Sequence, residues 1–422
     1  MLGWLKRIVA GRGPAELRVG DLRRRPFWLR ARYDAAATTD NNRRHWLFAD
    51  GLSANAAKSP EVRRTLRNRA RYEVANNSYA RGIVLTLAND VVGTGPRLQL
   101  LTEDPAANRR VEQEFQRWAR AVRLAEQLRT MRQACAEDGE AFAILTSNER
   151  LPGAVQLDLR LVEADQVTTP DLRLNNPDAV DGIVFDVDGN PIEYHVLRQH
   201  PGDTNIVGFG QAYDRIPAAL MIHLYRIDRP CQARGIPELT PALPLFAMLR
   251  DYSLATLDAA KAAAYFAGII YTDAPPNGET DAVEPMDPIE LERNVLLTMP
   301  GGWKMSQLHA EHPSGTYAEF KHEVLNEIAR CLNMPFNIAA GNSSGYNYAS
   351  GRLDHQTYFK AIRVEQSHIE AVVLDRILAA WLDEAVLIPG LLPTGVGSIA
   401  DWPHQWFWDG HEYVDPAKEA NA

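Results

Sequence analysis

The motif in this chain that could do chemistry most directly is a serine between glycines, Gly341-Asn-Ser343-Ser-Gly345. In serine hydrolases the GxSxG pattern places the nucleophile on a sharp turn between a buried strand and a helix. Here the preceding residues, Met334-Pro335, are typical of a helix end, so the required strand is not indicated. A hydrolase using Ser343 is therefore a remote alternative. The rest of its triad would have to come from Asp375 or Asp383 and from His404 or His411.

Two groups of potential metal ligands are also present. Asp186-x-Asp188-x-Asn190 matches the opening of an EF-hand, but the twelfth position is Leu197, where a calcium loop needs a glutamate. The same residues are typical of a tight turn, and we predict a hairpin there. The second group lacks the HExxH spacing of a zinc-binding helix, and we predict no metal site from it. It consists of His309, Glu311 and His312.

Several other activities are excluded by what the chain lacks. No GxxxxGK[ST] sequence occurs in its 422 residues, so it is not a P-loop ATPase. The cysteines Cys135, Cys231 and Cys331 form no CxxC pair, which fits a reducing compartment and excludes a compact cysteine zinc site. No run of eighteen apolar residues is present, so we expect no membrane contact. We predict that the protein is not an enzyme and needs no cofactor.

Charge is distributed unevenly along the chain. Residues 1–72 hold 17 Lys and Arg against 6 Asp and Glu, although the whole chain has a net charge of −9. The rest of the chain therefore carries −20, which argues against a body that grips phosphates by charge. The basic segment is either a solvated arm or a contact with nucleic acid or an acidic neighbouring subunit.

The first half of the chain mixes helical and strand patterns. Ser59-Pro60-Glu61 is typical of a helix start, and apolar residues then recur at helical spacing. Predicted helices cover 60–75, 77–91 and 105–137. Strict alternation of apolar and polar residues follows. Predicted strands cover 155–161, a hairpin at 182–197, and 221–225. These patterns indicate an α+β region over about residues 55–230.

The second half is dominated by long helices. Predicted helices cover 237–266, 316–332 and an uninterrupted stretch at 349–387. Strands at 268–271 and 295–298 are predicted within a polar excursion, and the glycine-rich segment 339–348 is predicted to be a loop. At ~1.5 Å per residue the last helix is roughly 55–60 Å long. A helix of that length needs neighbours, and other copies of the chain are the natural source.

Three tryptophans near the end of the chain could form a stacking platform for nucleic-acid bases. They are Trp402, Trp406 and Trp408. Clusters of this kind more often pack in a core or an interface, and we predict packing here.

Two blocks of the sequence resemble the lambda-type portal proteins of tailed bacteriophages. The first is Arg64–Leu100, with Asn68-Arg-Ala-Arg-Tyr-Glu-Val-Ala-Asn-Asn-Ser-Tyr-Ala-Arg-Gly82 and Val91-Val-Gly-Thr-Gly-Pro96. The second runs from Asn333-Met-Pro335 to Gly345-Tyr-Asn-Tyr-Ala-Ser-Gly-Arg352. Shorter likenesses extend the resemblance over about residues 30–420. They are Tyr33-Asp-Ala-Ala, Asn42-Arg-Arg-His-Trp46 and Val414-Asp-Pro-Ala-Lys-Glu419.

The resemblance implies an α+β portal fold made of eight consecutive parts. They are a basic arm (1–55), an α+β wing (56–235), a first stem helix (236–267), a clip (268–313), a second stem helix (314–334), a tunnel loop (335–349), a long wing helix (350–388) and a C-terminal segment (389–422). In this family a helical crown usually follows the last part, so we expect a truncated or minimal crown here.

The resemblance also implies a function. A portal subunit forms a ring, expected to be a dodecamer, at the unique capsid vertex through which double-stranded DNA is packaged and ejected. The predicted contacts with DNA lie in the tunnel loop at Asn342, Ser343, Ser344, Tyr346 and Asn347. A portal of a gene-transfer particle or of a defective prophage is an alternative with the same architecture.

The clip is the implied docking surface. Its acidic residues are Asp281, Glu284, Asp287, Glu290 and Glu292. The implied partners are the terminase large subunit, a head-completion or connector protein, and the capsid and scaffold proteins. The implied location is the virion, after assembly in the host cytoplasm.

Overall fold

The computed structural model describes residues 39–40, 42–170, 179–203, 212–265, 269–272, 303–306, 314–392 and 402–410. The chain divides into two compact units, residues 1–52 and 53–422. In the first unit residues 42–48 form turns, and the backbone amide of Thr39 donates to Asn42 Oδ1 at 2.7 Å. The remaining described elements belong to the second unit.

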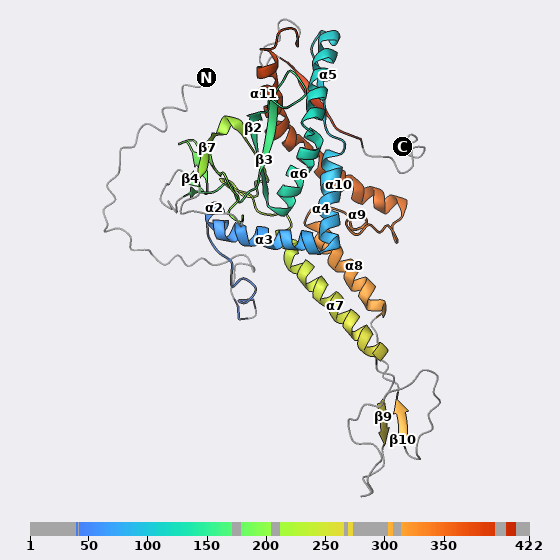
Figure 1. The fold of residues 1–422 in the computed structure, drawn as a ribbon. Coiled ribbons are helices and arrows are strands. Elements are labelled where there is room, and N and C mark those ends of the chain that lie inside the picture. Colours follow the sequence, from blue (N-terminus) through green and yellow to red (C-terminus); the bar gives the residue numbers. More distant parts are fainter. Residues whose placement is uncertain are drawn as a thin grey trace, which may run out of the picture. The chain divides into compact units, whose positions relative to one another are not determined.

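Helices come first in the second unit (Figure 1). They are α2 (Ala54–Ala57), α3 (Pro60–Asn76), α4 (Ser78–Val92), α5 (Pro105–Ala121) and α6 (Leu124–Glu137). Side chains of Ser59, Asn77 and Asp104 accept backbone amides at the starts of α3, α4 and α5, satisfying donors that the first turn leaves free. The predicted helices at 60–75 and 77–91 are confirmed. The helical region 105–137 is divided at Arg123, whose φ of 53° is left-handed.

Two antiparallel sheets follow. The first has the order β3-β2-β8. Its strands are β2 (Glu140–Ser147), β3 (Leu157–Val162) and β8 (Met221–Tyr225). The second has the order β4-β5-β6-β7. Its strands are β4 (Ala179–Val180), β5 (Ile183–Phe185), β6 (Pro191–Leu197) and β7 (Tyr213–Pro217), and the 3-10 turn η3 (Ala218–Leu220) links β7 to β8. The predicted hairpin at 182–197 is β5–β6, while β2 was not predicted.

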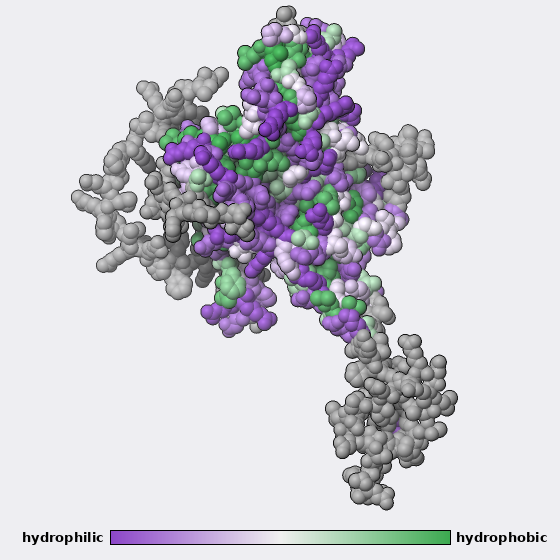
Figure 2. Space-filling model, viewed as in Figure 1, coloured by the Kyte–Doolittle hydropathy of each residue, from purple (hydrophilic) through white to green (hydrophobic). Residues whose placement is uncertain are grey.

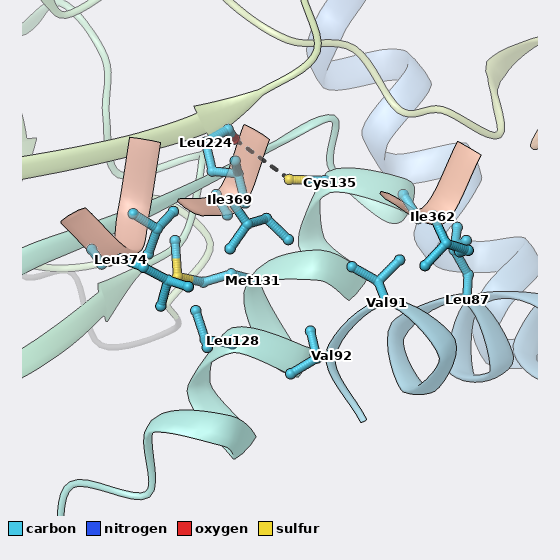
Figure 3. Close-up of a cluster of buried hydrophobic side chains, with 14 of the residues drawn as sticks. Leu87, Val91, Val92, Leu128, Met131, Cys135, Leu224, Ile362, Ile369 and Leu374 are labelled. Carbon is cyan, nitrogen blue, oxygen red and sulfur yellow. Dashed lines mark hydrogen bonds between the residues drawn. The ribbon is translucent and has the colours of Figure 1, made fainter. Parts of the chain in front are cut away.

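The main core forms where α4, α6, β8 and the C-terminal helices meet (Figure 3). Figure 3 shows Val91 and Val92 of α4 near Leu128 and Met131 of α6. The Cys135 thiol donates to the Leu224 carbonyl oxygen at 3.4 Å. Segments that are distant in sequence therefore share one apolar interior, and each buried side chain removes apolar surface from water.

Two long helices pack along one another beside this core (Figure 1). α7 (Leu243–Tyr265) begins after the 3-10 turn η4 (Thr240–Ala242), because Pro241 and Pro244 prevent a regular start at the predicted 237. The ring of Tyr252 on α7 stacks on Tyr317 of α8 (Ser314–Arg330), with centroids 5.7 Å apart. The described strands between these helices are β9 (Ile269–Thr272) and β10 (Trp303–Ser306), which pair antiparallel. The prediction of a strand at 295–298 lies outside the described residues.

The last helical region is continuous but not uniform. α10 (Tyr348–Ile369) passes into the π-helical segment η5 (Glu370–Leu374) and then α11 (Asp375–Ala385). The predicted helix at 349–387 is therefore right in extent and wrong in being uninterrupted. A π segment carries one residue more per turn, which shifts the faces of the helix that follows. Within the described residues, no helix combines the length and hydropathy needed to span a bilayer.

Candidate channel loop and its framework

The loop between α9 (Phe336–Ala340) and α10 is short and neutral. The predicted loop at 335–349 was too long, because Phe336–Ala340 is helical and only 341–347 is irregular. Glycines with φ of 62° and 88°, Gly341 and Gly345, allow its two sharp turns. The structure brings all five predicted channel residues into this loop. Asn342, Ser343, Ser344 and Asn347 are exposed, and Tyr346 is half-buried.

Hydrogen bonds within the loop fix its backbone. Asn342 Oδ1 accepts the Ser344 amide at 2.9 Å, and the Ser343 carbonyl accepts the Tyr346 amide at 3.2 Å. Asn347 caps α10, because its side chain accepts the Ser350 amide at 2.9 Å while Ser350 Oγ accepts the Asn347 amide at 3.2 Å. The Asn347 side chain thus caps the helix start, whereas Ser343 and Ser344 are exposed and their hydroxyls make no hydrogen bond to another described residue.

The base of the loop is anchored in the core. Phe336 and Ala339 of α9 are buried, and the Phe336 ring centroid lies 3.9 Å from that of His322 on α8. Asn337 Nδ2 lies 2.9 Å from His355 Nε2 and links α9 to α10. The arrangement presents small polar groups on a base that is packed against the core.

Among the described residues the geometry of the hydrolase alternative is not formed, and His411 lies outside them. Ser343 follows the helix α9 and not a strand, so the turn that would activate it is missing. His404 Nε2 does lie 3.2 Å from Asp375 Oδ1, but its Nδ1 lies 3.0 Å from the Trp402 carbonyl oxygen. Both imidazole nitrogens are therefore occupied, and neither is free to take a proton from a serine. The Asp375–His404 pair instead joins α11 to the strand β11 (His404–Phe407).

The possible metal ligands form ion pairs and turns. Asp186 accepts the backbone amides of Asp188 and Asn190 at 3.0 and 2.7 Å, so this is the predicted hairpin turn. Glu163, Asp165 and His200 lie close together. However, Arg71 reaches Asp165 at 2.8 Å and Glu163 at 3.3 Å and supplies the cation there. The structure does not describe the second group of possible ligands, from which we predicted no metal site. These residues are His309, Glu311 and His312.

Comparison with known protein families shows to which family this chain belongs. A family model for phage portal proteins of the lambda family matches residues 40–366. The chain belongs to this family of phage portal proteins. A curated relative, the probable portal protein of Halomonas phage phiHAP-1, is 27% identical over 387 residues, which covers 85% of this chain and 73% of the relative.

A solved structure shows the same fold. A chain from the neck of a native gene transfer agent (GTA) particle, computed with C12 symmetry, superposes with a TM-score of 0.51 at 15% identity, covering 86% of this chain and 87% of that one. A chain from the neck of the empty particle gives 0.49 at 15% identity, with 88% of each chain covered. The portal subunit therefore has the α+β portal fold, and it is a structural component of the phage virion.

A buried ion-pair network braces the α+β region of this portal subunit. Glu140 at the start of β2 accepts Arg234 Nη2 at 2.7 Å and lies 3.1 Å from His223 Nε2. A second buried arginine, Arg132 on α6, bonds to Glu238 and Glu365 at 2.8 and 2.7 Å. Charged residues distant in sequence gave no pattern from which these contacts could be predicted.

The C-terminal tryptophans of the portal subunit pack as predicted. Trp402 and Trp406 are buried, and β11 pairs antiparallel with β1 (Arg97–Leu100). Trp408 Nε1 donates to Glu370 in η5 at 2.6 Å. The stacking-platform alternative is therefore not supported. The predicted clip residues Asp281, Glu284, Asp287, Glu290 and Glu292 lie outside the described residues.

Proposed function

We propose that this portal subunit assembles head to tail into a closed ring, a dodecamer, at the unique capsid vertex. Double-stranded DNA passes through the centre of that ring during packaging and ejection. The subunit performs no catalysis, and a partner supplies the energy. Family membership supports this proposal, and so does the likeness of the fold to a neck chain described with C12 symmetry.

The observation that carries the proposal is the loop at 341–347. Its residues include neither Lys, Arg, Asp nor Glu, and its exposed side chains are small and polar. Such groups form weak hydrogen bonds with phosphate oxygens, whereas a row of lysines would bind tightly and with strong salt dependence. Weak contacts on a rigid base let DNA slide. The net negative charge of the chain after residue 72 opposes tight binding of the phosphate backbone.

The remaining assignments follow from the family. Residues 268–313 form the clip, and its acidic side chains dock the terminase large subunit and later a head-completion protein. The wing faces the capsid and scaffold proteins during assembly in the host cytoplasm. A gene-transfer particle or a defective prophage would use the same ring, but the 27% identity to a phage protein favours a phage.

The experiment places positive charge in the loop. Asn342→Lys with Ser344→Lys should lower the yield of packaged DNA about tenfold or more, because lysines retain the phosphate backbone, while ring assembly stays normal. A matched control places lysines at Val187 and Ile192, which are exposed in the β5–β6 hairpin. Unchanged packaging in the loop variant would show that the loop does not meet DNA.

A further inference from the structure

One side of α10 carries positive charge that no ion pair among the described residues neutralises. Arg352, Lys360 and Arg363 lie eight and three residues apart, a spacing that places them along one side of the helix. Lys360 and Arg363 are exposed and Arg352 is half-buried. Among the described residues none of the three has an ion pair. We refer to these three residues as the basic ridge.

The basic ridge adjoins exposed apolar surface. Leu353 is 67% exposed and Val364 is 65% exposed. Large aliphatic side chains of this exposure are costly in water and have no use against a phosphate backbone. The combination is typical of a protein-binding face, in which apolar residues are flanked by charges that set orientation.

A face of opposite charge lies on α8. Glu319, Glu323 and Glu327 recur every four residues and are all exposed. Glu323 is 3.2 Å from the Nδ1 of His322, and the other two have no ion pair among the described residues. Phe320, which is 45% exposed, stands beside them. We refer to the three glutamates as the acidic ridge.

The two ridges match in length as well as in sign. Eight residues separate Arg352 from Lys360 and Glu319 from Glu327, which is about 12 Å along each helix. Along the chain α9 lies between α8 and α10, and the described residues of the two ridges form no ion pair with each other. Figure 2 shows polar residues over much of the described face, with apolar residues among them.

We infer that the basic ridge of one subunit binds the acidic ridge of α8 in the neighbouring copy. Leu353 and Val364 pack near Phe320 in this contact. It joins different surfaces of identical chains, as a head-to-tail ring requires. The inference rests on the proposed ring and adds the surfaces that make it.

Charge reversal with rescue tests the contact. Lys360→Glu with Arg363→Glu, and separately Glu323→Lys with Glu327→Lys, should each lower the ring fraction in native mass spectra about tenfold or more, because like charges then face each other. Combining all four changes should restore rings. Arg150→Glu with Arg160→Glu is the matched control, since both arginines are exposed and belong to β3 or the segment before it, not to α8 or α10. Thermal unfolding of each variant verifies that it folds.

The possible outcomes distinguish failure of this contact from failure of the proposed ring. If the unaltered protein forms no rings, the proposed function fails. If it forms rings and either double variant does so equally well, the ridge contact is wrong and the ring stands. Two disrupted variants without rescue in the combination also contradict the pairing. Normal rings with reduced packaging in the Lys360→Glu, Arg363→Glu variant would mean that the basic ridge meets DNA instead.

Discussion

Arg234 and Glu140 form a two-pronged ion pair inside the α+β region. Arg234 Nη2 lies 2.7 Å from Glu140 Oε1, and Nε lies 2.9 Å from Oε2, with both side chains almost wholly buried. Burial alone would raise the pKa of Glu140, but the guanidinium of Arg234 and the hydrogen bond from His223 hold it well below its usual range. The carboxylate therefore stays ionised in the interior and depends on its partners.

Removing one partner of this pair should be costly. Arg234→Leu leaves the Glu140 carboxylate buried without its main counter-charge, which typically lowers the free energy of unfolding by about 3–5 kcal/mol. Denaturant titration followed by circular dichroism measures the loss. Arg198→Leu is the control, because its pair with Asp214 is exposed and should matter little. Equal effects of the two changes would contradict a special role for the buried pair.

The pH dependence of stability should trace in part to His223. Burial lowers the pKa of His223 below its ordinary 6.5, although Glu140 acts against this. The unfolded chain then binds a proton more readily than the folded one, so stability falls as pH drops through about 6.5 and lower. His223→Gln should reduce that fall between pH 7 and pH 5, measured as the thermal midpoint at each pH.

His45→Gln, a change at an exposed histidine, is the control for this series. The comparison between variants is needed because burial raises the pKa of Glu365, which acts in the opposite direction. An unchanged pH profile in His223→Gln would contradict the assignment.

Close backbone contact at the start of β2 leaves no room for a side chain. A Cβ on Gly235 would overlap the carbonyl oxygen of Gly139, and that glycine itself has a φ of 94°. Gly235→Ala should therefore destabilise the subunit by about 1–3 kcal/mol, as overpacking does. Gly82→Ala should instead be neutral or stabilising, because this helical glycine on α4 has open space around it. The unfolding midpoints of the two variants, compared with that of the unaltered protein, test both expectations.

Ser343 should be dispensable. Ser343→Ala removes one hydroxyl from a loop that keeps its glycine turns and its Asn347 cap, so ring assembly and packaging should stay within about twofold of the unaltered protein. Hydrolysis of an activated ester is the matching enzymatic measurement, and we expect no rate above background before or after the change. An esterase activity lost with Ser343 would revive the hydrolase.

Local patterns predicted much of this fold. The helix start at Ser59-Pro60, the β5–β6 hairpin and the polar loop around Ser343 each depend on neighbouring residues, and the structure confirms them. The strand β2 was not predicted because most of its residues are buried on both faces, which removes the alternation that marks a half-exposed strand.

Contacts between residues far apart in the sequence could not be predicted. Glu140 and Arg234 are 94 residues apart, and β1 pairs with β11 some three hundred residues later. A single sequence does not encode such pairings in its local spacing. The π segment η5 was missed for a related reason, since its residues suit an ordinary helix and the extra residue per turn depends on what packs around it.

The central claim is that this chain works as a ring, and native mass spectrometry with negative-stain microscopy of the purified full chain tests it most directly. We expect rings with a central hole and a mass near twelve times 47.1 kDa. A compact monomer at every protein concentration that can be reached, with no rings on the grid, would contradict it.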